Sequence, residues 1–229
     1  MINNNTHIVF DLDDTLYKEI DFVKSAYIYI NSYINFRFNL DLSNRIKKCL
    51  DGEVNFFDLI NSKLHPDQSF PIEKYLELYR FHYPKIKLSD DTTVFLDKII
   101  SHNIDFSIIT DGRSISQKNK IKALGLDDLA KNIIISEETG FEKPHLNNFK
   151  ILDRIYPNKK LIYIADNTSK DFLAPNSLNW DTICLINNGQ NIHPQDFNLN
   201  IDYLPKIKVN YLTEINIYDT IISTKYKRK

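Results

Sequence analysis

Two kinds of hydrophobic pattern alternate along the second half of the chain. Short runs of β-branched and other apolar residues are typical of strands, and apolar residues that recur every three or four positions are typical of helices. After an N-terminal apolar run at residues 7–10, we predict strands over residues 106–110, 133–136, 161–166, 182–187 and 203–209. We predict helices over residues 92–102, 116–124 and 146–156. This alternation predicts an α/β fold, a Rossmann-like parallel sheet between two layers of helices.

The segment from residue 19 to residue 83 interrupts this alternation, because it contains no strand pattern. Its apolar residues instead form helical stripes, at Phe22, Val23, Ala26, Tyr27, Ile30, Tyr33 and Ile34, and again at Ile72, Tyr75, Leu76, Tyr79 and Tyr83. We therefore predict a small helical domain, residues 19–83, inserted into an α/β core domain that comprises residues 1–18 and 84–229.

The composition is that of an ordinary globular protein. The chain has 229 residues, 42% of them hydrophobic and 26% charged, with a formal net charge of -1. There is no basic excess to suggest nucleic acid, no apolar run of membrane-spanning length and no secretory pattern in MINNNTHIVF. We expect a cytoplasmic protein, a monomer or homodimer, with neither nucleic acid nor a membrane as partner.

The few glycines exclude two cofactor-binding motifs. The chain has five glycines, and their positions match neither the dinucleotide fingerprint GxGxxG nor the phosphate loop GxxxxGK[ST]. Any phosphate group must therefore be bound in another way.

Polar residues that could take part in catalysis or binding follow the predicted strands. Parallel sheets bind ligands at the carboxyl ends of their strands, so these positions are the ones to inspect. The candidates, in chain order, are Asp11, Asp13, Asp14, Thr15, Thr110, Asp111, Gly112, Lys143, Asp166 and Asp171. Crowded carboxylates repel one another, and burying them is costly without a cation or hydrogen bonds. The sequence therefore predicts that a cation or hydrogen bonds compensate the carboxylates at this edge of the sheet.

The order and spacing of these residues resemble a known family. The pattern DxDxT at Asp11, Asp13 and Thr15 is followed by Thr110, by Lys143 and then by the acidic pair Asp166 and Asp171. The chain resembles the haloacid dehalogenase superfamily, in the branch that carries a helical cap after the first strand and includes enzymes similar to phosphoglycolate phosphatase. The resemblance covers essentially the whole chain.

The resemblance implies roles for individual residues. Asp11 is the expected nucleophile, and Asp13 the expected general acid and base. Mg²⁺ is the expected cofactor, held by Asp11, by the backbone carbonyl of Asp13 and by Asp166. The residues expected to bind the phosphate group are Thr110, Asp111, Gly112 and Lys143. The residues expected to surround the metal ligands are Thr15, Asn167 and Asp171. Asp14 has no expected catalytic role.

The implied activity is that of a Mg²⁺-dependent phosphatase, which hydrolyses a small phosphorylated metabolite through an aspartyl-phosphate intermediate. The substrate could be a sugar phosphate, phosphoglycolate or a nucleoside monophosphate. A phosphomutase, a phosphonate hydrolase or a catalytically silent binding or signalling protein are alternatives. A dehalogenase is disfavoured, because cleavage of a carbon–halogen bond has no use for Asp13. Tyrosines and arginines of the helical domain are candidates for substrate selection, and the same tyrosines could instead pack that domain's core.

Overall fold

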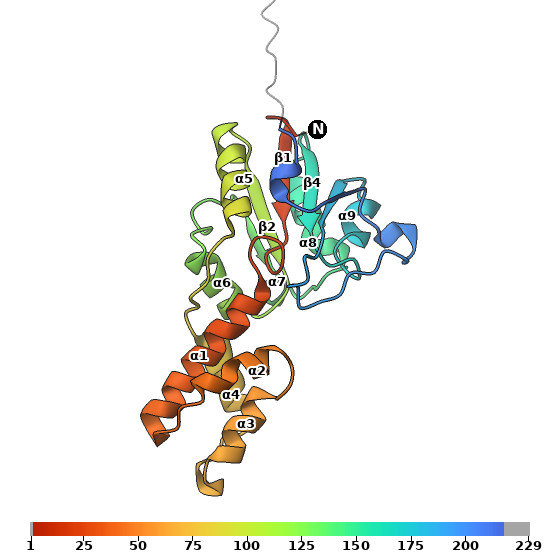
Figure 1. Ribbon diagram of the computed structural model, residues 1–229. Helices are drawn as coiled ribbons and strands as arrows, with labels where there is room; N and C mark the ends of the chain where they lie inside the picture. The colour runs from red at the N-terminus through yellow and green to blue at the C-terminus, as the bar shows by residue number, and fades with distance from the viewer. Residues whose placement is uncertain (1, 218–229) are drawn as a thin grey trace, which may run out of the picture.

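The computed structural model describes residues 2–217 (Figure 1). The basic run at residues 225–229, which the sequence suggests is a solvated tail, lies outside this part of the chain. Among the described residues, no helix combines the length and the apolar character that crossing a membrane requires.

A six-stranded parallel sheet forms the centre of the α/β core. Its strands lie in the order β3-β2-β1-β4-β5-β6. Their bounds are β1 Thr6–Phe10, β2 Phe106–Thr110, β3 Ile133–Ile135, β4 Lys160–Ala165, β5 Asp181–Leu185 and β6 Ile207–Val209. The chain leaves β1 toward β2 on one side and returns to β4 on the other. The strand order thus reverses between β1 and β4, the point where open α/β sheets bind ligands.

The predicted strands are all present, but β3, β4 and β5 end one or two residues earlier than predicted, and β6 begins four residues later. Ser136 begins a short helix instead of ending β3. The predicted last strand over residues 203–209 is only three residues long, and a 3₁₀ helix, Ile201–Tyr203, precedes it. Pro205 lies between them, and a proline cannot donate a hydrogen bond to a neighbouring strand.

Alternating side chains of β1 face two separate cores. Ile8 and Phe10 pack with helices α5 and α6, whereas Val9 packs with helices α8 and α9. The helices of the core are α5 Asp90–Ser101, α6 Ser114–Ala123, α7 Ser136–Thr139, α8 Leu146–Ile155 and α9 Leu173–Ser177. Both faces of the sheet are covered, and all five residues of β1 are buried. The three-layer α/β fold expected from the alternating pattern is confirmed.

Four helices between β1 and α5 form a unit with its own hydrophobic core. We call helices α1 to α4 the helical unit. Their bounds are α1 Glu19–Phe38, α2 Ile46–Leu50, α3 Phe56–Lys63 and α4 Ile72–Phe81. The unit lies beyond the carboxyl ends of the strands (Figure 1). Tyr75 is fully buried within it, and Tyr27 stacks on Phe56, so these two tyrosines pack the unit itself.

The helical unit contacts the α/β core through both of its ends. Phe22 of α1 belongs to the same hydrophobic cluster as β1. Where the chain leaves α4, the hydroxyl of Ser116 donates to the carbonyl of Arg80 at 3.1 Å, and the amide of Asn119 donates to the carbonyl of His82 at 3.2 Å. Helix α6 is therefore the part of the core on which the end of the helical unit rests.

Candidate active site

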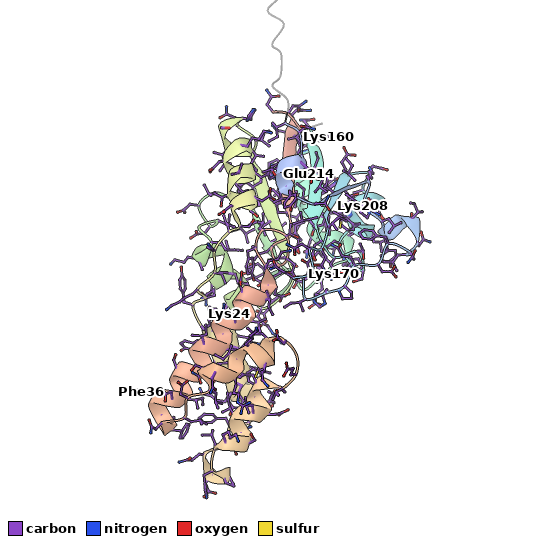
Figure 2. The ribbon with its side chains drawn as sticks, in the orientation of Figure 1. Lys24, Phe36, Lys160, Lys170, Lys208 and Glu214 are labelled. Atoms are coloured by element: carbon purple, nitrogen blue, oxygen red, sulfur yellow. The ribbon has the colours of Figure 1, made fainter. Side chains whose placement is uncertain are left out.

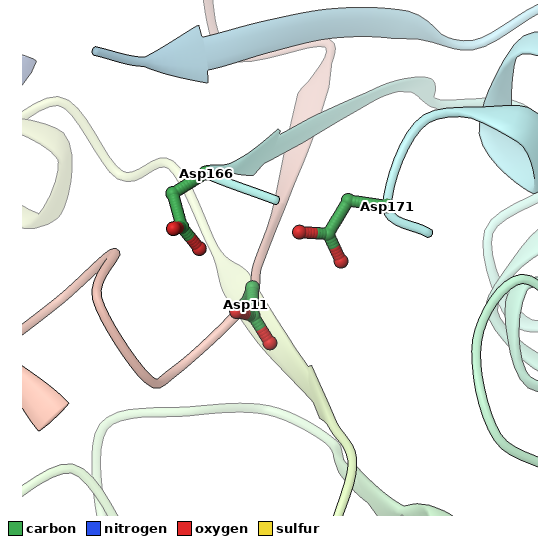
Figure 3. A group of neighbouring side chains, drawn as sticks. All are labelled: Asp11, Asp166 and Asp171. Atoms are coloured by element: carbon green, nitrogen blue, oxygen red, sulfur yellow. The ribbon is translucent and has the colours of Figure 1, made fainter. Parts of the chain in front are cut away.

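Three aspartates from two neighbouring loops meet at the reversal point of the sheet. Asp11 follows β1 and Asp166 follows β4, and the backbone N–H of Asp11 donates to the carbonyl of Ile164 at 2.9 Å. One carboxylate oxygen each of Asp11, Asp166 and Asp171 lies within 4.8 Å of the others, and all three residues are buried (Figure 3). The carboxylates that the sequence places far apart are therefore a single cluster.

The three carboxylates of this cluster carry more negative charge than Lys143, the lysine paired with two of them, compensates. Burial, with repulsion from Asp171, raises the pKa of Asp11 to about 7, although Lys143 opposes the change. Burial and repulsion from Asp171 and Asp11 raise the pKa of Asp166 to about 8. Carboxylate oxygens are the ligands that Mg²⁺ prefers, and a divalent cation would relieve this repulsion. The donor set therefore fits the expected metal.

Lys143 provides the positive charge closest to the cluster. Its Nζ lies 2.6 Å from a carboxylate oxygen of Asp11 and 2.6 Å from one of Asp171, and donates to the hydroxyl of Tyr163 at 3.2 Å. The Lys143 side chain is 1% exposed, so both ion pairs are shielded from water. Burial lowers the pKa of Lys143, but Asp11 and Asp171 outweigh it and hold the pKa well above the ordinary value.

Asp13 lies in a different environment from Asp11. The Nζ of Lys120 donates to both carboxylate oxygens of Asp13, at 2.8 and 2.9 Å. The amide of Gln117 donates to Oδ2 at 3.0 Å, and the hydroxyl of Tyr17 donates to Oδ1. Burial tends to raise the pKa of Asp13, but these donors together lower it below the usual value. Lys120, Gln117 and Tyr17 therefore favour the carboxylate form of Asp13, which is the form that can accept a proton.

The loop after β2 brings the predicted phosphate-binding residues to the same edge. The Thr110 hydroxyl accepts a hydrogen bond from Gln117 at 2.5 Å, and the backbone N–H of Gly112 donates to the hydroxyl of Ser136 at 3.0 Å. Gly112 has φ +134°, a conformation that favours glycine. The carboxylate of Asp111 accepts from the backbone N–H of Lys143 at 3.1 Å and thus ties the two loops together.

The remaining predicted residues differ in their contacts. The backbone N–H of Asn167 donates to Asp171 at 2.8 Å, so Asn167 does lie beside the carboxylate cluster. The hydroxyl of Thr15 is buried and has no hydrogen-bond partner among the described residues. Asp14 has φ +58° and accepts from the backbone N–H groups of Glu19 and Ile192, at 3.0 and 2.8 Å. Asp14 therefore fixes the start of the helical unit.

Several side chains of this region were not predicted from the sequence. Gln117 and Lys120 are three residues apart on α6 and so share one helix face, which is turned toward Asp13. The sequence feature that could have identified this pair is its position on the helix that follows Thr110-Asp111-Gly112. Lys170 donates to Asp111 at 3.2 Å and lies near the junction of the core with the helical unit (Figure 2). Asn191 donates to Asp166 at 2.8 Å, and no local pattern marks it.

A small cavity of about 90 Å³ opens onto this cluster. It is lined by Asp11, Asp13, Asp14, Glu19, Thr110, Asp111, Asp166, Asn167, Lys170 and His193. The cavity therefore brings together the aspartates, the threonine and a lysine from loops that are far apart in the sequence.

Comparisons with known proteins agree with this arrangement. Residues 8–185 match the family model of the haloacid dehalogenase-like hydrolases. Glyceraldehyde 3-phosphate phosphatase of Methanocaldococcus jannaschii is 30% identical over 193 residues, which are 78% of this chain and 84% of that protein.

Solved structures share the fold at lower identity. YfnB of Bacillus subtilis, described as a HAD-hydrolase bound to magnesium, has a TM-score of 0.62 and 19% identity, with 93% of this chain and 97% of that chain covered. The 2-haloacid dehalogenase of Pseudomonas syringae pv. Tomato has a TM-score of 0.59 and 16% identity, with 93% and 96% covered. Enzymes of different chemistry thus share this fold, and the reaction must be argued from the site.

Proposed function

Because the chain belongs to the haloacid dehalogenase-like hydrolase family, we propose that it is a Mg²⁺-dependent phosphatase, which hydrolyses a small phosphomonoester metabolite through an aspartyl-phosphate intermediate. The observation that supports this proposal best is the buried position of Asp11, between the carboxylates of Asp166 and Asp171 and the ammonium of Lys143, with Asp13 two residues away. The M. jannaschii relative, a glyceraldehyde 3-phosphate phosphatase, supports a sugar phosphate as substrate.

Asp11, Asp166 and the backbone carbonyl of Asp13 would hold Mg²⁺, with Asp171 beside them. When bound, the ion supplies positive charge that lets an anionic nucleophile approach an anionic phosphate group. Lys143 adds a fixed charge on the same side, because its ammonium contacts both Asp11 and Asp171. The hydroxyl of Thr110 and the backbone N–H groups around Gly112 are the groups that would orient the phosphoryl oxygens.

The reaction takes place in two displacements at phosphorus. In the first, a carboxylate oxygen of Asp11 forms a bond to phosphorus while the ester P–O bond breaks, and the leaving oxygen takes a proton from Asp13. Asp13 must take up this proton from solvent before the step, because Lys120 and its other donors favour the carboxylate in the free protein. In the second, Asp13, now a carboxylate, takes a proton from water as the water oxygen attacks phosphorus. The bond between phosphorus and Asp11 breaks, and inorganic phosphate and the free Asp11 carboxylate are regenerated.

Asp13 also separates this proposal from dehalogenation. A halide leaves without a proton, so a dehalogenase has no need of a group in the position of Asp13. Here Asp13 is held by Lys120, Gln117 and Tyr17, so its orientation is specified by three other side chains. We further propose that the helical unit acts as the cap, which closes over the leaving group and selects the substrate.

Phosphate release from a panel of small phosphomonoesters tests the proposal. We expect release with Mg²⁺, none with a chelator, and at least a roughly 10³-fold loss of kcat in Asp11→Asn, because an amide is a poor nucleophile. Asp105→Asn, an exposed aspartate at the opposite ends of the strands, is the matched control. Full activity of Asp11→Asn would refute the mechanism. Absence of release from every ester would favour a mutase or a phosphonate hydrolase.

A further inference from the structure

Glu19 is a carboxylate of the cavity that the proposed reaction does not use. It is the first residue of α1 and thus comes from the helical unit, whereas the other described residues that line the cavity belong to the α/β core. Its backbone N–H donates to Asp14 at 3.0 Å, which directs the start of α1 toward the cavity. Glu19 therefore lines, from the helical unit, the same cavity as Asp11 and Asp13.

The side chain of Glu19 has no partner of its own. It makes no hydrogen bond or ion pair within residues 2–217, although it is partly buried. Lys120 is a nearby cation, but both of its short contacts are to Asp13. Burial, with repulsion from Asp13, raises the pKa of Glu19 to about 7, so the site does not compensate its charge. A partly buried carboxylate without a partner in a cavity is a candidate for ligand binding.

The charges around Glu19 restrict what could bind there. The lysines near the phosphate side of the cavity, Lys143 and Lys170, are both paired with aspartates. Besides burial, Asp13, Asp14 and Asp11 raise the pKa of Glu19, and Lys120, which lowers it, is already paired with Asp13. A second anionic group on the substrate would meet this negative region, and an apolar group would bury the carboxylate without a hydrogen bond. A hydroxyl group can donate to it and meets neither penalty.

We propose that Glu19 is a specificity-determining residue, which accepts a hydrogen bond from a hydroxyl group of the leaving alcohol. The substrates are then short polyhydroxy phosphomonoesters, and esters with a carboxylate or an apolar chain in place of the hydroxyl are rejected. This inference rests on the proposed phosphatase function and goes beyond it by naming the residue that recognises a hydroxyl group of the substrate.

Three esters with the same three-carbon chain test this inference. They are glycerol 3-phosphate, which carries hydroxyl groups at C1 and C2, 3-phosphoglycerate, which keeps the C2 hydroxyl and has a carboxylate in place of the C1 hydroxymethyl group, and propyl phosphate, which carries neither a hydroxyl nor a carboxylate. The full-length protein with Mg²⁺ is assayed for kcat/KM on each. For the wild type we expect kcat/KM on glycerol 3-phosphate to exceed the other two by at least about tenfold. Propyl phosphate lacks the hydroxyl that the site would bind, and the carboxylate of 3-phosphoglycerate would be repelled by Glu19.

Two variants of Glu19 separate hydrogen bonding from charge. In Glu19→Ala we expect the preference for glycerol 3-phosphate over propyl phosphate to disappear. In Glu19→Gln, which keeps the shape and a hydrogen-bonding oxygen, we expect 3-phosphoglycerate to gain at least about tenfold relative to glycerol 3-phosphate. Glu73→Gln, an exposed glutamate of α4, is the control and should leave all three ratios unchanged.

The possible outcomes distinguish this inference from the proposed function. Phosphate release from the three esters, with ratios of kcat/KM that neither Glu19 variant alters, would overturn the proposed role of Glu19 and leave the phosphatase proposal intact. An equal loss of kcat/KM on all three esters in the Glu19 variants would show a merely structural role for Glu19 and would also overturn its proposed role in specificity. If the wild type releases phosphate from none of these or any other ester, the proposed phosphatase function fails, and this inference fails with it.

Discussion

The Nζ of Lys120 lies 2.8 and 2.9 Å from the two carboxylate oxygens of Asp13, and the two residues are 107 positions apart in the sequence. The Lys120 side chain is 5% exposed and that of Asp13 is 18% exposed, so this ion pair is largely shielded from water. Lys120 also lies 4.3 Å from the centre of the Phe22 ring of α1. One lysine of the core thus contacts both the expected general acid and the first helix of the helical unit.

Loss of Lys120 should destabilise the protein. We expect Lys120→Met to lower the free energy of unfolding by about 3 kcal/mol, because a largely buried Asp13 carboxylate would lose its partner. Urea unfolding of Lys120→Met, Asp13→Asn and the double variant measures this effect. The double variant should be less destabilised than the sum of the two single variants. Lys122→Met, an exposed position of the same helix, is the control, and strict additivity would contradict the coupling.

Mg²⁺ should stabilise the protein through Asp166. At a concentration of 100 times Kd, the ion is expected to add about 2.7 kcal/mol to the free energy of unfolding. We expect Asp166→Asn to lose most of this gain without being less stable than the wild type in chelator, because the substitution removes the repulsion that raises the pKa of Asp166. Thermal unfolding with and without Mg²⁺ tests both points. An unchanged response to Mg²⁺ in Asp166→Asn would place the ion elsewhere.

His7 should make the stability depend on pH. It stacks on Tyr156, its Nε2 is hydrogen-bonded to Ser107 at 2.8 Å, and its Nδ1 is buried without a partner among the described residues. Burial lowers the pKa of His7 from 6.5 to about 4. Between these two values the unfolded chain binds a proton that the folded protein does not. The contribution of His7 is therefore full above pH 6.5 and falls as the pH is lowered toward 4.

The stability difference between the wild type and His7→Phe measures this contribution. As the pH is lowered from 6.5 to 4, the wild type should lose up to about 1.4 kcal/mol of unfolding free energy per pH unit relative to His7→Phe, because the phenylalanine does not titrate. His65→Gln, an exposed histidine, serves as the comparison and should follow the wild type. A difference that stays constant over this range would show that His7 does not stay neutral in the folded protein.

Gly112 should be required for the geometry of the loop after β2. A Cβ atom at Gly112 would lie 3.4 Å from Cδ of Gln117, and its φ of +134° is unfavourable for other residues. We expect Gly112→Ala to destabilise the protein by about 1 to 3 kcal/mol and to lower activity, because Gln117 contacts both Thr110 and Asp13. Gly125 also has a positive φ, but apart from its chain neighbours no described atom lies within 4 Å of the place that a Cβ atom would take. As the control, Gly125→Ala should therefore reduce stability without reducing kcat.

The order of the elements follows from local patterns in the sequence. The alternation of apolar runs with helical stripes predicted the parallel sheet, and the absence of strands over residues 19–83 predicted the helical unit. The motif at Asp11, Asp13 and Thr15 and the later Lys143, Asp166 and Asp171 predicted a hydrolase of the haloacid dehalogenase superfamily, which the family match confirms. The roles of the individual residues remain predictions.

Other features depend on residues that only folding brings together. Lys120 pairs with Asp13, Asn191 donates to Asp166, and Glu19 faces the cavity. No local pattern marks Asn191 or Glu19, and the position of Lys120 after the loop at residues 110–112 does not identify Asp13 as its partner. The sequence by itself determined the strands, the helices and the strand ends that carry aspartates, because periodicity and motif spacing act over a few residues. Only the tertiary structure decided which charges are paired and which are left free, because ion pairing depends on distances across the sheet and on burial.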